Sequence, residues 1–182
     1  MKDNIYKEYL SETKLLDFSN KNIQKLILDN KWNELSDVEK VKSSYNFTKE
    51  KILFGYNKDD CLKASEVLKD GFGQCNTKSI LLMALLRALK IPCRIHGFTI
   101  DKKLQKGSMI GLVYKLAPKE IFHTYVEVYV NNRWYDLEGV ILDYKYLNSL
   151  QKIVKPNTDG SLVGYGVATK NFFKSNNIFW ML

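Results

Sequence analysis

Two residues of this chain have types and sequence settings that suit nucleophilic chemistry. Cys75 follows Gly71 and Gly73 and opens an apolar stretch, while His123 opens a stretch of alternating apolar and polar residues. Backbone N–H groups at a helix N-terminus lack partners and carry the positive end of the helix dipole, so they favour thiolate over thiol. A histidine beside that sulfur can stabilise the thiolate and carry its proton. The two residues therefore outline a thiol nucleophile and its base.

The apolar stretch predicts a helix from about residue 75 to residue 90. Its sequence leaves little polar face, so we expect the helix to be buried nearly all round. Pro92 prevents the helix from continuing. Lys78 and Arg87 interrupt the apolar pattern, and we expect both to be solvated or salt-bridged. The alternative is that they tune the thiol.

Short helices are expected before this central helix. Residues 1 to about 56 place apolar side chains at roughly helical spacing. Ser36 and Glu39 fit a capping box, which predicts a helix that starts there and runs toward Thr48. A further short helix is expected over 64–69.

After Pro92 the apolar period changes to two, which predicts strands over 94–100, 124–130 and 133–137. Asn131-Asn132 suits a two-residue hairpin turn because asparagine tolerates positive φ. The segment 101–120 is expected to be an inserted loop or lid. Helices followed by a meandering antiparallel sheet define an α+β fold.

The hairpin register limits which acid can orient the histidine. With a turn at Asn131-Asn132, Glu127 faces Asp136 and Tyr125 faces Glu138, on the same face as His123. Glu138 is then diagonal to His123, within roughly 7–8 Å between backbones. Asp136 is one pair further away and is the alternative acid, which a bulge would favour.

Two segments together resemble those of a known family of cysteine hydrolases. The first is GFGQCNTKSILLMALLRALKIPCRIHGF and the second is HTYVEVYVNNRWYDLEG. They are similar to the nucleophile and histidine segments of the transglutaminase-like superfamily, and the resemblance covers about residues 63–139. It implies a papain-like fold in which Cys75 is the nucleophile, His123 the base and Glu138 the third member of the triad.

The chain departs from the family pattern at three places. The family usually has aspartate as the triad acid, often aspartate after the cysteine, and often tryptophan two residues after the histidine. Here these positions hold Glu138, Asn76 and Tyr125. A glutamate can still accept the imidazole N–H, so we expect an altered spacing rather than loss of the triad.

The chemistry that the resemblance implies is acyl transfer through an acyl-enzyme. The backbone N–H of Cys75 is the expected first donor to the oxyanion, with Gln74 or Tyr56 as candidates for the second. No metal or other cofactor is expected. Cys93 and His96 have metal-like spacing, but no second pair accompanies them.

We expect one domain over 1–182, with a core at about 63–139, a helical part at 1–56 and a C-terminal extension at 140–182. The apolar end 178–182 predicts packing against the domain or a chain cut short. The formal charge is +8, but lysine supplies most of it and is spread along the sequence, which argues against specific nucleic-acid binding.

The expected partner is a peptide or protein substrate, or a small amide. No signal segment and no run of roughly 18 apolar residues is present, and the three cysteines have no framework spacing, so a cytoplasmic protein that does not bind membranes is expected. The resemblance implies that cross-linking members are large calcium enzymes, and no acidic calcium loop is seen here, so hydrolysis is favoured. The alternatives are a non-catalytic peptide-binding module on the same fold and a basic nucleic-acid-associated protein. Substrate, acyl acceptor and oligomeric state stay open.

Overall fold

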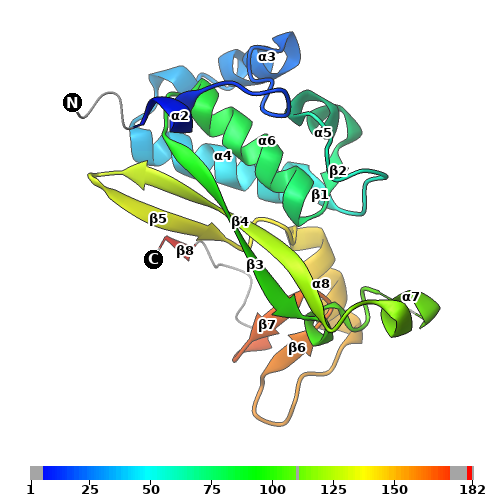
Figure 1. Cartoon of the computed structure of the whole chain (residues 1–182). Coiled ribbons are helices and arrows are strands. Elements are labelled where there is room, and N and C mark those ends of the chain that lie inside the picture. The colour runs from blue at the N-terminus through cyan, green and yellow to red at the C-terminus, as the bar shows by residue number, and fades with distance from the viewer. Residues whose placement is uncertain (1–5, 110, 173–179, 182) are drawn as a thin grey trace. The chain divides into compact units, whose positions relative to one another are not determined.

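Figure 1 shows the computed structural model, which describes residues 6–109, 111–172 and 180–181. The chain divides into two compact units. The described part of the first unit is 6–96, 124–143 and 180–181, and that of the second is 97–109, 111–123 and 144–172. The organisation of the whole chain as one domain stays a prediction.

Helices make up most of the first unit before the sheet begins. They are α2 (Lys7–Leu10), α3 (Lys21–Asp29), the 3-10 turn η1 (Trp32–Glu34), α4 (Asp37–Lys51), α5 (Ala64–Asp70) and α6 (Cys75–Ala88). The capping box is confirmed, because the backbone N–H of Ser36 donates to Glu39 Oε2 at 3.0 Å and α4 begins at the next residue. In Figure 1, α6 lies among α3, α4 and α5.

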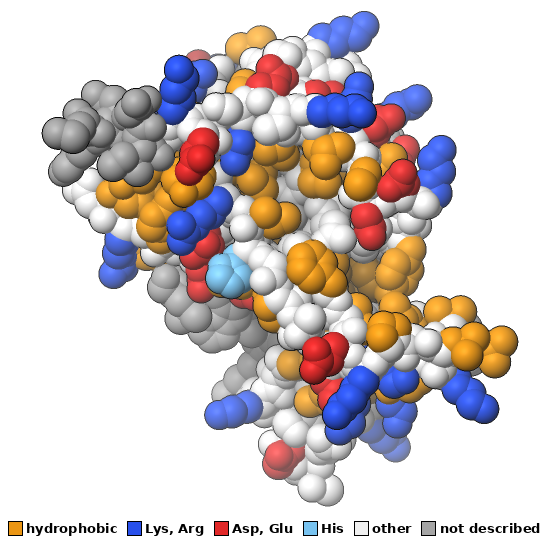
Figure 2. Space-filling model, in the orientation of Figure 1, with side chains coloured by type: hydrophobic (Ala, Val, Ile, Leu, Met, Phe, Trp, Pro, Cys, Tyr) orange, Lys and Arg blue, Asp and Glu red, His pale blue; other side chains and the backbone are white. Residues whose placement is uncertain are grey.

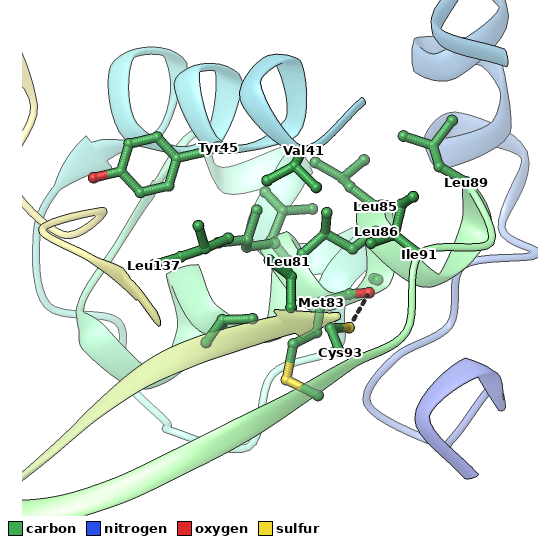
Figure 3. Close-up of a cluster of buried hydrophobic side chains, with 14 of the residues drawn as sticks. Val41, Tyr45, Leu81, Met83, Leu85, Leu86, Leu89, Ile91, Cys93 and Leu137 are labelled. Atoms are coloured by element: carbon green, nitrogen blue, oxygen red, sulfur yellow. Dashed lines mark hydrogen bonds between the residues drawn. The ribbon is translucent and has the colours of Figure 1, made fainter. Parts of the chain in front are cut away.

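The hydrophobic core of this unit surrounds α6. Leu81, Leu85 and Leu86 are fully buried, and Figure 3 shows them beside side chains of α4 and of the sheet, including Leu137. The helix ends before Lys90, which has φ 63°, and Pro92 follows. The prediction of a central helix buried nearly all round is therefore confirmed.

In the part of the chain that the structure describes, the strands form one larger sheet and two small ones. They are β1 (Leu53–Phe54), β2 (Phe72–Gly73), β3 (Cys93–Asp101), β4 (Glu120–Val130), β5 (Arg133–Glu138), β6 (Leu162–Gly164), β7 (Val167–Thr169) and β8 (Trp180–Met181). The larger sheet has the order β3-β4-β5-β8, and β1 pairs with β2 in parallel. Mixed helices and strands in this order confirm the α+β prediction.

The β4–β5 hairpin has the predicted register. Glu127 pairs with Asp136 and Val130 with Arg133, in antiparallel orientation. Asn131 and Asn132 have φ values of 52° and 65°, as a two-residue turn of this kind requires. β8 continues the sheet beside the end of β5. Ile178, Phe179 and Leu182, which belong to the apolar end predicted to pack, lie outside the described residues.

The second unit contains the 101–120 segment and most of the C-terminal extension. Its elements besides β6, β7 and the adjoining parts of β3 and β4 are η2 (Lys102–Gln105), α7 (Gly111–Leu116) and α8 (Tyr144–Ile153). The β6–β7 hairpin is fastened to η2 by backbone bonds, among them Gly166 N–H to Leu104 O at 2.7 Å. Figure 2 shows apolar side chains gathered at the surface near α7, where Leu112, Val113 and Leu116 are exposed.

Candidate active site

Glycines shape the turn that delivers Cys75 to the first position of α6. Gly71 has φ 72° and ends α5. Gly73 pairs with Phe54, and a Cβ at Gly73 would lie 2.6 Å from Thr77 Oγ1. Because even an alanine would clash there, the chain can approach the start of α6 this closely only with glycine at residue 73.

The residue before the cysteine anchors a neighbouring loop. The side-chain oxygen of Gln74 accepts the backbone N–H of Asn57 at 2.8 Å, and its side-chain amide donates to Asp60. The backbone N–H of Gln74 donates to Thr77 Oγ1 at 3.1 Å, while the Thr77 hydroxyl donates to Asn57 Oδ1 at 2.7 Å. This network fixes the loop that starts at Asn57 against the start of α6.

The two candidates for the second oxyanion donor differ in their surroundings. Gln74 is buried, and its side-chain amide is occupied by Asp60. Tyr56 is 52% exposed, and its ring meets Phe54 edge-on at 5.6 Å between centroids. The role of either side chain as a donor to an oxyanion stays a prediction.

The sulfur of Cys75 is partly buried and lies near polar side chains. It is 3.7 Å from Asn76 Oδ1, which also accepts the hydroxyl of Thr124 at 3.1 Å. That hydroxyl is 3.4 Å from Ser79 Oγ. Burial raises the pKa of the Cys75 thiol, while hydrogen bonds from the backbone of Asn76 and from Thr124 lower it. Burial has the larger effect, so the net shift favours the protonated thiol.

The three cysteines occupy different environments. Cys61 is exposed in a loop, Cys93 is fully buried, and Cys75 is partly exposed. The thiol of Cys93 points to the carbonyl of Met83 at 3.6 Å (Figure 3), and burial raises its pKa to about 12. Among the cysteines, Cys75 combines partial access with a helix N-terminus, which are the features that a nucleophile needs.

Glu138, the predicted acid, is the last residue of β5. Its backbone carbonyl accepts the hydroxyl of Tyr45, a buried residue of α4. Burial raises the pKa of the Glu138 carboxyl, the negative charge of Asp136 raises it further, and the backbone N–H of Gly139 lowers it. The carboxyl is half-buried at the end of β5, and the hydroxyl of Tyr45 anchors the backbone of this strand end to α4.

Asp136, the alternative acid, belongs to a different set of charges. It faces Glu127 across the hairpin, and burial and that negative charge raise its pKa. Glu127 itself accepts both Nε and a terminal nitrogen of Arg94, at 2.7 and 3.3 Å. Arginine can donate to both carboxylate oxygens at once, so Arg94 and Glu127 form a two-point ion pair. His96 Nδ1 lies 3.6 Å from the same carboxylate.

His123 lies in β4, immediately before Thr124. Its ring meets Phe98 edge-on with 5.2 Å between centroids, and burial lowers the pKa of its imidazole. His123 and Phe98 belong to the second unit, whereas Cys75 and Glu138 belong to the first. The meeting of these three residues in one triad is a prediction from the sequence.

Two charged residues on α6 were predicted wrongly. Lys78 has no exposed surface and donates to backbone carbonyls, and Arg87 is buried with bonds to the carbonyls of Ser11 at 2.7 Å and Cys93 at 3.0 Å. Both lie on a helix that is covered on all sides, so neither can reach solvent or a surface ion pair. The pattern did carry a signal, since a helix apolar all round buries any charge within it.

Comparisons with known proteins agree with this architecture. The model of the transglutaminase-like superfamily matches residues 27–139, more than half of the chain. The chain therefore belongs to the transglutaminase-like superfamily. No curated protein matches it.

A solved structure of a "putative cysteine protease" from Cytophaga hutchinsonii is similar, with a TM-score of 0.54 and 19% sequence identity. The match covers 71% of this chain and 39% of that chain. At this identity the similarity shows a shared fold and nothing about activity.

Proposed function

We propose that this chain is a thiol hydrolase or acyltransferase that acts on a peptide, isopeptide or related amide. Cys75 is the nucleophile, His123 the base and Glu138 the acid that orients it. The superfamily to which the chain belongs commonly contains cysteine hydrolases and acyltransferases, which supports the coarse activity. The substrate class and the residue roles are the proposal.

The strongest support for the proposal is one hydrogen bond. The residue after Cys75, Asn76, accepts the hydroxyl of the residue after His123, Thr124, at 3.1 Å. Neighbouring Cα atoms in a chain are only about 3.8 Å apart. This bond supports a close approach of the backbone at the two proposed catalytic positions.

The proposed reaction has two steps. His123 takes the proton of Cys75 as the sulfur attacks the substrate carbonyl, and it gives that proton to the leaving nitrogen as the C–N bond breaks. A water molecule, deprotonated by His123, then attacks the thioester and releases the acid and the thiol. An amine in place of water gives acyl transfer.

Charge on the carbonyl oxygen is stabilised at the start of α6. The N–H of Lys78 makes the first helical bond, to Gln74 O at 2.9 Å. The N–H of Cys75 precedes that bond, so it has no acceptor within the helix. It is the proposed first donor to the oxyanion.

The proposed location of the protein is the cytoplasm. Its proposed partner is a peptide, a protein or a small amide, and the proposed reaction uses no metal or cofactor. Within residues 6–109, 111–172 and 180–181, no helix has both the length and the apolar character to cross a bilayer. The compartment itself is part of the proposal.

A burst assay with 4-nitrophenyl acetate tests the function. We expect a rapid release of nitrophenolate, stoichiometric with protein, and a matching acetyl adduct on Cys75 by mass spectrometry. Cys75→Ala should abolish the burst, and the matched control Cys61→Ala should retain it. His123→Ala should slow the burst by about 100-fold or more. A burst that survives Cys75→Ala, or no burst from the folded wild type, would refute the proposal.

The alternative, a non-catalytic peptide-binding module, is favoured by a specific observation. Burial raises the pKa of the Cys75 thiol, which opposes nucleophilic reactivity. In addition, neighbouring side chains of a strand point to opposite faces of the sheet. The side chain of Thr124 bonds to Asn76, so the side chain of His123 is expected on the opposite face of β4. This alternative expects a folded protein that gives no acetyl adduct at Cys75.

A further inference from the structure

Lys78 is a buried charge for which the proposed reaction has no direct use. It lies one turn after Cys75 on α6, and none of its surface is exposed. A lysine almost never reaches this degree of burial without compensating bonds, because removing an ammonium group from water is costly. Its partners therefore indicate what it does.

The amino group of Lys78 joins three separate segments of the first unit. It donates to Lys49 O at 3.1 Å, to Ile52 O at 2.7 Å and to Ile141 O at 3.0 Å. The first two carbonyls belong to the end of α4 and the residue after it. The third lies shortly after β5, the strand that ends at Glu138.

The 138–143 segment is also held at both its ends. The Tyr45 hydroxyl donates to the carbonyl of Glu138, and the Asp143 carboxylate accepts the N–H of Phe54 at 2.7 Å. Gly139 has φ 75°, so the backbone turns sharply just after the acid. The bond from Lys78 secures the middle of this turn to the helix that carries Cys75.

We propose that Lys78 is a positioning residue that fixes Glu138 relative to Cys75 by holding the 138–143 segment against α6. This inference rests on the proposed function, because it gives Lys78 a role through the triad acid. Cys75 and Lys78 lie on one rigid helix, so any shift of the segment away from Lys78 also moves Glu138 relative to the thiol.

The test compares Lys78→Met with Lys49→Met. Methionine keeps the apolar stem of lysine and removes the donor. Lys49 is the matched control, since it is a buried lysine that contributes its backbone, rather than its amino group, to these bonds. Cooperative thermal melting verifies the fold of each variant, and Lys78→Gln replaces Lys78→Met where the methionine variant does not melt cooperatively.

Hydrogen exchange gives the first readout, which does not depend on activity. We expect faster exchange in residues 138–143 for Lys78→Met and wild-type exchange for Lys49→Met. Unchanged exchange in residues 138–143 would overturn the inference that Lys78 holds this segment against α6. The exchange measurement tests whether Lys78 holds the segment even if the wild type gives no burst and the proposed function fails.

The second readout is the burst rate as a function of pH. We expect Lys78→Met to lower the rate by about 10- to 100-fold and to give the pH profile of Glu138→Gln. The double variant, with both Lys78→Met and Glu138→Gln, should be no slower than the slower single variant. Both substitutions remove the same contribution, the positioning of His123 by Glu138. A wild-type pH profile in Lys78→Met, or fully multiplicative effects, would show that Lys78 does not act through Glu138.

Discussion

At Cys75, burial and hydrogen bonding act on the same proton in opposite directions. Burial raises the pKa of the thiol, and the bonds from Asn76 and Thr124 lower it only in part. Burial therefore opposes the thiolate that the helix N-terminus favours. A positively charged imidazole beside the sulfur would stabilise the thiolate, which is the role proposed for His123.

At Lys78, burial lowers the pKa of the amino group to about 7, although Asp143 and Glu50 raise it. In the unfolded chain the same lysine keeps its proton up to its ordinary value of 10.5. Between these limits the unfolded state binds more protons than the folded state. The free energy of unfolding contributed by Lys78 must then rise with pH across this window and fall as pH drops toward 7.

We therefore predict that the stability of the wild type relative to Lys78→Met increases from pH 7 to pH 10. The increase should approach about 1.4 kcal/mol per pH unit at most, the limit for one proton. Urea unfolding of both proteins under reducing conditions measures the difference. A difference that stays constant over this range would mean that Lys78 keeps its proton in the fold.

At the scale of elements, the β4–β5 hairpin determines where the acids lie. Its turn requires positive φ at both Asn131 and Asn132, and the register of every later residue follows from it. A one-residue slip would exchange the two faces and move Glu138 to the core side. The turn is thus a structural requirement of the proposed triad.

Substitution at Asn132 tests this requirement. Valine is strained at positive φ, so Asn132→Val should lower the free energy of unfolding by about 1–2 kcal/mol. Glycine adopts this conformation freely, so Asn132→Gly should equal or exceed the wild type. Urea unfolding distinguishes the two variants, and equal stability of Asn132→Val and wild type would contradict the observed turn.

Local signals made several elements predictable from sequence. The central helix, the capping box at Ser36 and the hairpin each depend on residues close together in the chain. α8 and the β6–β7 hairpin were not predicted. β6 and β7 are three residues each, too short for a periodic signal, and their partner η2 is distant in sequence.

Side-chain environments were harder to predict than elements. The burial of Lys78 depends on carbonyls of Lys49, Ile52 and Ile141, which only the folded chain brings together. The bond from Thr124 to Asn76 likewise joins strand and helix. Thr124 shares its strand phase with the buried Val126 and Val128, a pattern that could have indicated an inward-facing hydroxyl.

At the scale of the whole molecule, β3 and β4 run through both compact units. The family match ends at residue 139, so the whole C-terminal extension, 140–182, lies beyond it. Cys75 and Glu138 belong to one unit and His123 to the other. The meeting of the imidazole and the thiol is therefore part of the proposal.

Titration of the two histidines by NMR tests this central claim most directly. A thiolate beside His123 must raise its pKa, so Cys75→Ala should lower the pKa of His123 by about one unit or more. The NMR signal of His96, which lies beside Glu127 rather than Cys75, serves as the internal control for the fold of both proteins. The same His123 pKa in wild type and a fully folded Cys75→Ala would contradict the thiol–imidazole pair.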